Sequence, residues 1–314
     1  MYAAVVRSFA EPPRYQQFPT PTVAGGHEVL VEVVAAGLHP RVRSAANGSH
    51  YTSKGELPMI PGIDGVGRTA EGELVYFVAP DDGVGTMAEY AVVDRRRSVV
   101  LPVGTDPVAV AAAMNPAMSS WIALRERVRF QPGGSVLILG ATGNAGQLAV
   151  QVARQLGAGR VVGTGRDPER LELLAALGAD EVVELSDTDG LAKAAADVDV
   201  VLDYLWGSPS EQVMPALLTA RTDRAEPLTW VQIGSVAARE LTLPSYLLRA
   251  AALTLVGSGQ GSVSPADIVA ELPELARLIS SGTFTVNPRP RPLAEVEDAW
   301  SAVAAPGERV VLTV

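Results

Sequence analysis

The chain has 314 residues, of which 47% belong to the hydrophobic set and 19% are charged. This composition excludes a disordered chain, and the length is typical of two domains. Cysteine is absent, which excludes disulfides, thiolate metal sites and a cysteine nucleophile. The formal net charge of −10 argues against a protein that binds nucleic acid.

Targeting and membrane signals are not expected in this sequence. The apolar run at the N-terminus is too short for the core of a signal peptide, and Arg7 and Glu11 interrupt it. The charge-free segment 107–124 contains Pro107 and Pro116, and we interpret it as a buried connector and helix rather than a membrane span. We therefore expect a soluble, cytoplasmic protein that has no membrane partner.

The first third of the chain has the pattern of a small, mostly β unit. Short segments rich in β-branched residues alternate with Gly and Pro, which is typical of strands joined by turns. A helix is expected to follow over 107–130. The expected strands are 28–37, 73–80, 87–94 and 98–104.

From residue 135 the pattern changes to strands that alternate with helices. The run SVLILG (135–140) is apolar throughout, as in a parallel strand that is covered on both faces. Alternation of this kind predicts an α/β fold with a doubly wound parallel sheet of the Rossmann type. The remaining expected elements are strands at 160–165, 181–185, 198–205, 228–234 and 253–258 and helices at 145–157 and 167–178.

The end of the chain leaves the βα repeat. Helices are expected over 266–282 and 293–304, followed by a strand over 308–314. This last strand has no repeat left to join, so it could return to the N-terminal β unit.

The strongest local signal is the loop between the strand at 135–140 and the helix that follows it. Gly140, Gly143 and Gly146 are three residues apart. Gly140 would permit the tight turn, Gly143 would let the backbone approach a pyrophosphate, and Gly146 would let helix and strand pack closely. Because phosphates bind to free N–H groups at a helix N-terminus, this context favours dinucleotide binding over a simple glycine-rich turn. The expected contacts are Thr142, Gly143, Asn144, Ala145 and Gly146.

The end of the next strand indicates which dinucleotide binds. An NAD site usually has a carboxylate at this position, which accepts hydrogen bonds from the ribose hydroxyls. Here the strand ends at Gly165 and is followed by Arg166, with Arg170 one turn into the next helix. A guanidinium can bind a 2′-phosphate with two hydrogen bonds, so we expect NADP(H). The alternative is that both arginines are solvated surface charges that Asp167 and Glu169 offset.

Several ordered motifs resemble a known family over nearly the whole length. These motifs are VLVEVVAAGLHP, LPMIPGIDGVG, GTMAEYAVVD, the glycine loop and the ending PGERVVLTV. The chain resembles the zinc-free quinone oxidoreductases of the medium-chain dehydrogenase/reductase superfamily. The resemblance implies a mostly β, GroES-like catalytic domain built from both chain ends, 1–113 and 262–314. It also implies a dinucleotide-binding Rossmann domain over 114–261, with the nicotinamide in the cleft between the two.

The resemblance also implies a reaction without a metal. Zinc enzymes of the superfamily bind catalytic zinc at positions that align with His39, Ile63 and Asn115. Isoleucine has no donor atom and one imidazole cannot make a three-ligand site, so no metal site is expected. Two further departures from the family are the short stretch 69–86 and a histidine at position 39, where relatives often have Asn.

The resemblance places His39, Tyr51, Asn115 and Ser119 around the nicotinamide. Tyr51 could donate a proton to the reduced substrate, or it could be a loop tyrosine with water as the proton source. His39 could form a hydrogen bond with ribose or substrate, or make a routine polar contact. Asn115 is a further catalytic candidate, and Ser119 is grouped with the residues that contact the cofactor.

Other candidates come from strand ends and turns. Asp64, in the turn PGIDGVG, could orient groups near the cleft, although an Asp in such a turn is usually structural. Asp203 ends an expected strand at the edge where ligands bind, but it could equally cap the following helix. By the same rule, Gly234 and Ser235 should lie near the nicotinamide.

The leading hypothesis is an NADPH-dependent oxidoreductase that transfers hydride to a quinone or an α,β-unsaturated carbonyl. The alternative is a non-catalytic NADPH-binding redox sensor. A short-chain dehydrogenase is disfavoured because Tyr51 and Lys54 have the wrong spacing for its Tyr-x-x-x-Lys pair. The segment 253–258 would be an apolar edge strand, and pairing of this edge across a two-fold axis predicts a homodimer.

Overall fold

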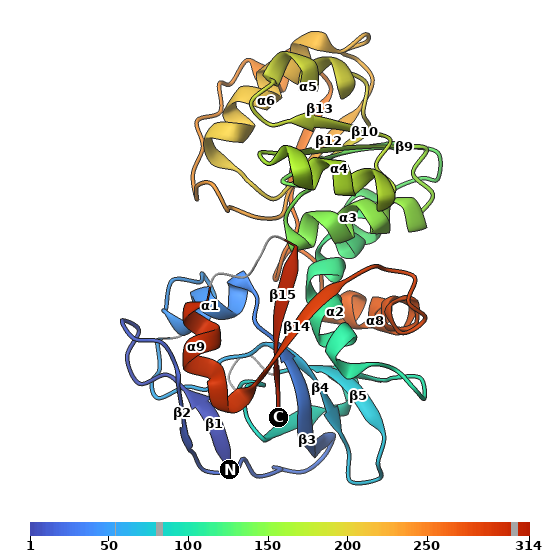
Figure 1. The fold of residues 1–314 in the computed structure, drawn as a ribbon. Helices are drawn as coiled ribbons and strands as arrows, with labels where there is room; N and C mark the ends of the chain where they lie inside the picture. The colour runs from blue at the N-terminus through green and yellow to red at the C-terminus, as the bar shows by residue number, and fades with distance from the viewer. Residues whose placement is uncertain (54, 80–83, 303–306) are drawn as a thin grey trace. The chain divides into compact units, whose positions relative to one another are not determined.

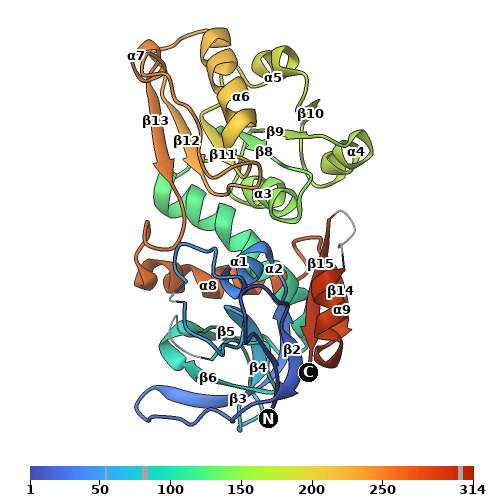
Figure 2. The same ribbon diagram turned by 90° about the vertical axis from the view of Figure 1, so that its left-hand side faces the viewer.

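The computed structural model describes the whole chain except residues 54, 80–83 and 303–306. It divides into two compact units: a first unit of Met1–Asn115 with Val269–Val314, and a second unit of Pro116–Ile268 (Figures 1 and 2). Three parts of the sequence analysis therefore lie outside the described residues. They are Lys54, residue 80 at the end of the expected strand 73–80, and residues 303–304 at the end of the expected helix 293–304.

The first unit is built on a mostly antiparallel sheet with the strand order β14-β15-β3-β4-β5-β7, in which β6 also pairs with β3. All four strands expected from the N-terminal sequence are present, and β3 has the predicted bounds. Before these strands in the chain, β1 (Tyr2–Val5) and β2 (Arg14–Gln17) pair antiparallel as a separate two-stranded sheet. The sheet strands are β3 (Glu28–Gly37), β4 (Asp64–Arg68), β5 (Leu74–Val78), β6 (Tyr90–Asp94) and β7 (Ser98–Val100).

The chain end completes this sheet. Strand β15 (Glu308–Thr313) pairs antiparallel with β3, which confirms that the last strand returns to the N-terminal β unit. Strand β14 (Asn287–Pro292) pairs parallel with β15 at the sheet edge and was not expected from the sequence NPRPRP. Its prolines alternate, so their missing N–H groups all face the unpaired side of the strand.

Helices cover the first unit and join its two chain segments. In α1 (Pro40–Ala46), the Arg43 guanidinium donates to the carbonyl of Trp300 in α9 (Val296–Ser301) and lies over the Trp300 ring. Apolar residues of α9 and β15 share one buried cluster with β1 and β3. The remaining helices are α8 (Pro265–Ser280) and the short turn η3 (Leu293–Glu295).

The apolar segment after β7 forms α2 (Pro107–Ile122) and continues as a π-helical segment, η2 (Ala123–Val128). Its length and composition would allow it to cross a membrane, but 67% of its most apolar window is buried inside the protein. This burial agrees with the expected connector and core helix. Pro116 lies inside α2 and cannot supply a backbone N–H to the helix.

The second unit contains a six-stranded parallel sheet with the order β10-β9-β8-β11-β12-β13. The order reverses between β8 and β11, which is the Rossmann arrangement and confirms the predicted fold class. Strand β13 lies at one edge, as expected. The strands are β8 (Ser135–Leu139), β9 (Arg160–Gly165), β10 (Glu181–Glu184), β11 (Val200–Asp203), β12 (Leu228–Gln232) and β13 (Leu253–Gly257).

The helices of the second unit follow from local signals in the sequence. Helix α4 (Pro168–Ala176) has proline in its first turn, and the Asp167 carboxylate caps it by accepting from the N–H of Glu169. Side chains of α5 and α6 pack with Trp230 and the apolar sheet residues in one buried cluster. The other helices are α3 (Asn144–Gln155), α5 (Thr188–Ala194), α6 (Gly207–Ala220) and α7 (Leu247–Ala250).

Candidate functional site

The candidate coenzyme residues gather at the carboxyl edge of the parallel sheet. The register pairs Leu139 with both Thr164 and Asp203, and Asp203 with Gln232. These residues are therefore level, and the chain leaves the sheet at one edge after each of them. Ligands of open α/β sheets bind at this edge, where the strand order reverses. The residues that follow are Gly140, Gly165, Tyr204 and Ile233.

The three glycines of the loop after β8 meet different physical constraints. Gly140 has φ +86°, which confirms the tight turn. A Cβ on Gly146 would lie 2.3 Å from the Gly140 carbonyl oxygen, so its close packing is also confirmed. A Cβ on Gly143 would come no closer than 3.5 Å to another described residue. Protein packing therefore does not require glycine at position 143, and the contact of Gly143 with a coenzyme stays a prediction.

Helix α3 begins directly after this glycine. Gly143 is its N-cap residue and has no side chain that could accept from the first N–H groups of the helix. The positive end of the helix dipole and these N–H groups favour a negatively charged ligand. Thr142, Asn144 and Ala145 flank the same turn, and their contact with a coenzyme stays a prediction.

The end of β9 combines close packing with exposed positive charge. A Cβ on Gly165 would lie 2.4 Å from Cγ2 of Thr142, so the loop after β8 packs directly on this strand end. Arg166 is exposed and forms no ion pair with any residue that the structure describes. Nε of Arg170 lies 3.1 Å from Oδ2 of Asp167, so the charge of Arg170 is partly neutralised. Arg166 is thus the better placed of the two arginines to bind a phosphate.

Asp203 is buried, and its carboxylate is fully used within the protein. Oδ1 accepts from the backbone N–H groups of Leu205 and Trp206, each at 2.9 Å. Oδ2 accepts from Ser210 Oγ at 2.5 Å and from Trp230 Nε1 at 2.9 Å. These bonds favour the alternative interpretation, in which Asp203 fixes the turn into α6, while its contact with a cofactor stays a prediction. Trp206 has a φ of 59° in that turn, a backbone conformation rare outside glycine.

Tyr204 is a residue of this edge that the sequence did not single out. Its hydroxyl lies 3.0 Å from Ser119 Oγ, which connects the end of β11 to α2. Burial raises the pKa of Tyr204 to about 12, although hydrogen bonds with Ser119 and Ser120 act against the rise. A Cβ on Gly234 would lie 2.7 Å from the Tyr204 carbonyl oxygen, so packing explains this glycine. Ser235 is exposed one residue further along.

In the first unit, His39 belongs to a buried polar network. Its Nε2 lies 2.9 Å from Oδ1 of Asp64, and the other oxygen of Asp64 accepts from the Tyr76 hydroxyl at 2.9 Å. The three side chains are 2%, 2% and 0% exposed. Asp64 therefore orients His39, which the sequence considered possible, while Tyr76 was not foreseen.

Burial of this network favours the neutral imidazole. Burial lowers the pKa of His39, and Arg309 and Arg41 lower it further against the opposing effect of Asp64. Burial also lowers the pKa of Arg309 to about 10, so this guanidinium stays charged at neutral pH near the Asp64 carboxylate.

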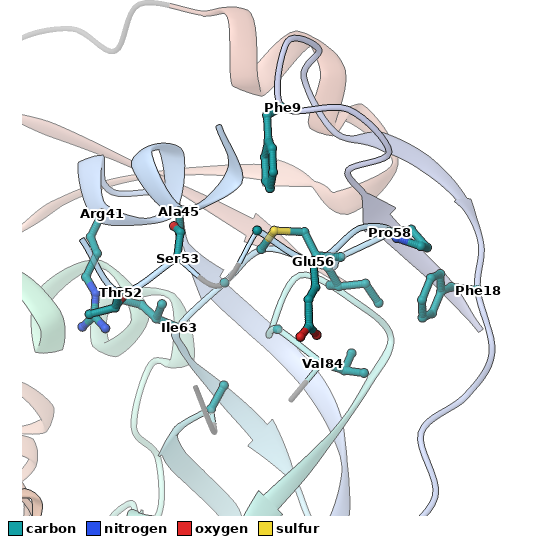
Figure 3. A pocket seen from close by; sticks show the side chains of 16 residues that line it. Phe9, Phe18, Arg41, Ala45, Thr52, Ser53, Glu56, Pro58, Ile63 and Val84 are labelled. Atoms are coloured by element: carbon teal, nitrogen blue, oxygen red, sulfur yellow. The ribbon is translucent and has the colours of Figure 1, made fainter. Parts of the chain in front are cut away.

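A cavity of about 410 Å³ lies elsewhere in the first unit (Figure 3). This volume is in the range of small-molecule sites. Figure 3 shows Phe9 and Glu56 in the middle of the lining, with Arg41 at one end and Phe18 at the other. The wall combines apolar side chains with a few polar ones. The lining residues include Phe9, Phe18, Arg41, Ala45, Glu56 and Ile63.

The other two catalytic candidates are placed differently from His39. Tyr51 is 74% exposed, its ring lies 4.4 Å from the ring of His50, and it is not among the residues that line the cavity. Asn115 is half-buried in α2. A Cβ on Gly37 would contact both Ala111, one turn before Asn115, and the His39 ring, so the end of β3 packs closely on this helix.

The donor atoms do not fit a zinc ion. Nε2 of His39 is hydrogen-bonded to Asp64, position 63 is an isoleucine, and the sequence has no cysteine. Across residues 1–53, 55–79, 84–302 and 307–314, no group of three or more His, Asp or Glu side chains could hold a metal. A catalytic zinc requires three protein ligands.

Comparison with known proteins supports this arrangement. A family model described as zinc-binding dehydrogenase matches residues 145–281. A probable NADPH-dependent quinone reductase of Emericella nidulans is 33% identical, with 99% of each chain covered. An NADPH-dependent alkenal/one oxidoreductase of Arabidopsis thaliana is 30% identical over 57% of this chain and 50% of its own length.

A solved quinone oxidoreductase of Thermus thermophilus, whose structure was also determined with NADPH, covers all of both chains with a TM-score of 0.82 and 29% identity. Full-length similarity to a quinone reductase thus accompanies the Rossmann sheet and the glycine loop. The chain belongs to the quinone oxidoreductase family of the medium-chain dehydrogenase/reductase superfamily.

Proposed function

We propose that this protein catalyses the NADPH-dependent reduction of a quinone or an α,β-unsaturated carbonyl, without a metal. The observation that carries the proposal is the uncapped start of α3 at Gly143, where a Cβ would clash with no described residue. This helix start lies at the sheet edge where Rossmann folds bind dinucleotides. The names of the relatives, an NADPH-dependent quinone reductase and an alkenal/one oxidoreductase, support both the coenzyme and the two classes of acceptor.

The residues of the second unit are suited to hold this coenzyme. The N–H groups at the start of α3 would bind the pyrophosphate, and Arg166 would bind the 2′-phosphate. Thr142, Gly165 and Arg170 would shape the phosphate end, while Ser119, Gly234 and Ser235 would lie toward the nicotinamide. When bound, the coenzyme supplies the hydride for the reaction.

The first unit would bind the acceptor. We propose that the cavity lined by Phe9, Phe18 and Ile63 takes the apolar part of a quinone or enone, with Arg41 facing an oxygen. The neutral His39 carries no proton beyond the one shared with Asp64, so it is a poor proton donor at neutral pH. The exposure of Tyr51 favours water as the proton source, directly or through this phenol.

A pair of glycine substitutions tests the coenzyme site. Gly143→Ala adds a methyl group where the protein leaves space, so the folded protein should keep its thermal stability and lose NADPH affinity at least tenfold. Gly146→Ala is the matched control, because its Cβ would meet the backbone at 2.3 Å and should lower stability instead. Calorimetric titration and thermal unfolding measure both effects.

The activity itself is tested with a panel of quinones and enones. The absorbance of reduced nicotinamide should fall with at least one acceptor, and it should fall equally after treatment with a chelator. Tight NADPH binding without turnover on any acceptor would instead favour a redox sensor. Loss of activity with the chelator would contradict the metal-free reaction.

Three finer features belong to the same proposal. The functional domains would be 1–113 with 262–314 and 114–261, the protein would be cytoplasmic, and it would form a homodimer. No strand among the described residues pairs with the outer edge of β13, and Leu253 and Leu255 are half-buried there, which supports pairing across a two-fold axis. A monomer mass in light scattering would rule out the dimer.

A further inference from the structure

Glu56 is the one acidic side chain among the described residues that line the cavity of the first unit. Figure 3 shows its carboxylate in the middle of the lining, between Ile63 and Val84. Glu56 is exposed, and it forms no hydrogen bond or ion pair with any residue that the structure describes. A ligand that fills the cavity displaces water from this carboxylate, which costs free energy unless the ligand supplies a hydrogen-bond donor.

A second polar group of the lining, the hydroxyl of Thr52, is fixed as an acceptor. Nδ1 of His50 accepts from the backbone N–H of Thr52 at 3.3 Å, so this nitrogen carries a lone pair. The Thr52 hydroxyl lies 2.8 Å from the same nitrogen and donates to it. Burial lowers the pKa of His50 and the charge of Arg41 lowers it further, so the ring is neutral at neutral pH. The Thr52 hydroxyl therefore presents only lone pairs to a ligand.

These two acceptors restrict what a ligand has to bring. A carbonyl oxygen has no proton to donate, so it forms a hydrogen bond with neither of them. Arg41 and Glu56 are the two charged residues of the described lining, and their signs are opposite. A cationic ligand would therefore meet Arg41, and an anionic ligand would meet Glu56. A neutral group with a polar hydrogen avoids both conflicts, and a hydroxyl is the smallest such group.

We propose that Glu56 is a specificity-determining residue that accepts a hydrogen bond from a neutral hydroxyl group of the acceptor. The acceptor is then a quinone or enone that carries a hydroxyl group in addition to the carbonyl that is reduced. This assignment rests on the proposed function, in which the same cavity binds the acceptor. Glu56 orients the molecule and takes no part in the transfer of hydride or proton.

A matched pair of acceptors tests the preference in the wild-type protein. The two compounds are para-naphthoquinones with either a hydroxymethyl or an ethyl group at the same ring carbon, so a hydroxyl replaces a methyl. A site that forms a hydrogen bond with a hydroxyl discriminates against an analogue without it. With saturating NADPH, kcat/KM should be about three- to tenfold higher for the hydroxymethyl compound. Equal values, or a preference for the ethyl compound, would overturn the proposal.

Substitutions then assign the preference to Glu56. Glu56→Leu removes the acceptor at similar size, so the ratio of the two kcat/KM values should fall to one or below. Glu56→Gln keeps an oxygen that accepts a hydrogen bond and should retain part of the preference. Glu32→Leu makes the same change at an exposed position of β3 outside the cavity lining and should leave the ratio unchanged. A folded Glu56→Leu protein with the wild-type ratio would overturn the proposal.

Equilibrium titrations separate this inference from the proposed function, because they do not depend on turnover. If neither compound is reduced but the hydroxymethyl compound binds more tightly to the wild-type protein than to Glu56→Leu, the proposed function fails while the role of Glu56 stands. If both compounds are reduced and the ratio does not depend on Glu56, the proposed function stands and this inference fails. Absence of binding by both compounds, or tighter binding of an analogue with an ammonium group at the same place, would also overturn the inference.

Discussion

The selectivity of the second unit for a phosphorylated coenzyme should depend on Arg166. This side chain is exposed directly after β9 and forms no ion pair with any described residue. Its guanidinium is therefore available to a 2′-phosphate, which does not have to displace a carboxylate of the described residues first. Arg166→Ala removes this charge without opening a cavity in the protein.

The expected magnitude follows from the exposure of Arg166. A hydrogen bond to a charged group contributes about 1.5–3 kcal/mol when it is shielded, whereas exposed ion pairs contribute about 0–1 kcal/mol. An exposed arginine on a phosphate dianion should fall between these ranges, at about 1–2 kcal/mol. The Kd for NADPH should then rise roughly 5- to 30-fold in Arg166→Ala, while the Kd for NADH stays the same. Arg170→Ala should have a smaller effect because Asp167 already pairs with Arg170.

Calorimetric titration of both coenzymes into each variant provides the measurement. Arg160→Ala is the matched control, since Arg160 lies at the opposite end of the same strand and pairs with Glu181. Higher salt should weaken NADPH binding to the wild-type protein more than to Arg166→Ala. The reasoning is refuted if Arg166→Ala loses as much affinity for NADH as for NADPH, or loses none.

Further predictions follow from the buried groups and the cavity. Asp203→Asn places amide hydrogens against Ser210 or Trp230 and should lower the free energy of unfolding by about 3 kcal/mol in urea titrations; a stable protein with weakened NADPH binding would restore Asp203 as a coenzyme contact. Ala45→Phe should partly fill the cavity and lower kcat/KM for bulky quinones at least tenfold, with an unchanged Kd for NADPH; equal turnover of such quinones would place the acceptor elsewhere. Because burial lowers the pKa of His39 below its ordinary 6.5, the unfolded chain binds the extra proton first, so stability should fall by up to ~1.4 kcal/mol per pH unit as the pH drops below 6.5. His39→Gln should lack this part of the acid sensitivity in urea unfolding, and an identical pH dependence would mean that His39 does not titrate this way.

The elements that the sequence predicted well are those with strong local patterns. The apolar run at 135–140, the glycine spacing after it and the capped start of α4 each depend on residues that are close in the chain. Parallel strands buried on both faces are apolar throughout, so the Rossmann sheet could be recognised before any contact was known. The exposed Arg166 and the glycine loop were found for the same reason.

The tertiary structure alone decided which polar groups are already satisfied. Asp203 looked like a ligand residue at a strand end, but its carboxylate meets Trp230, which is 27 residues further along the chain. His39 and Asp64 are 25 residues apart, and no local periodicity relates them to each other or to Tyr76. Strand β14 was missed because prolines are unfavourable in most strand positions. Its pairing with β15, which makes it an edge strand, exists only in the folded sheet. Sequence patterns report local backbone preferences and burial, whereas hydrogen-bond partners depend on contacts between distant segments that exist only once the chain has folded.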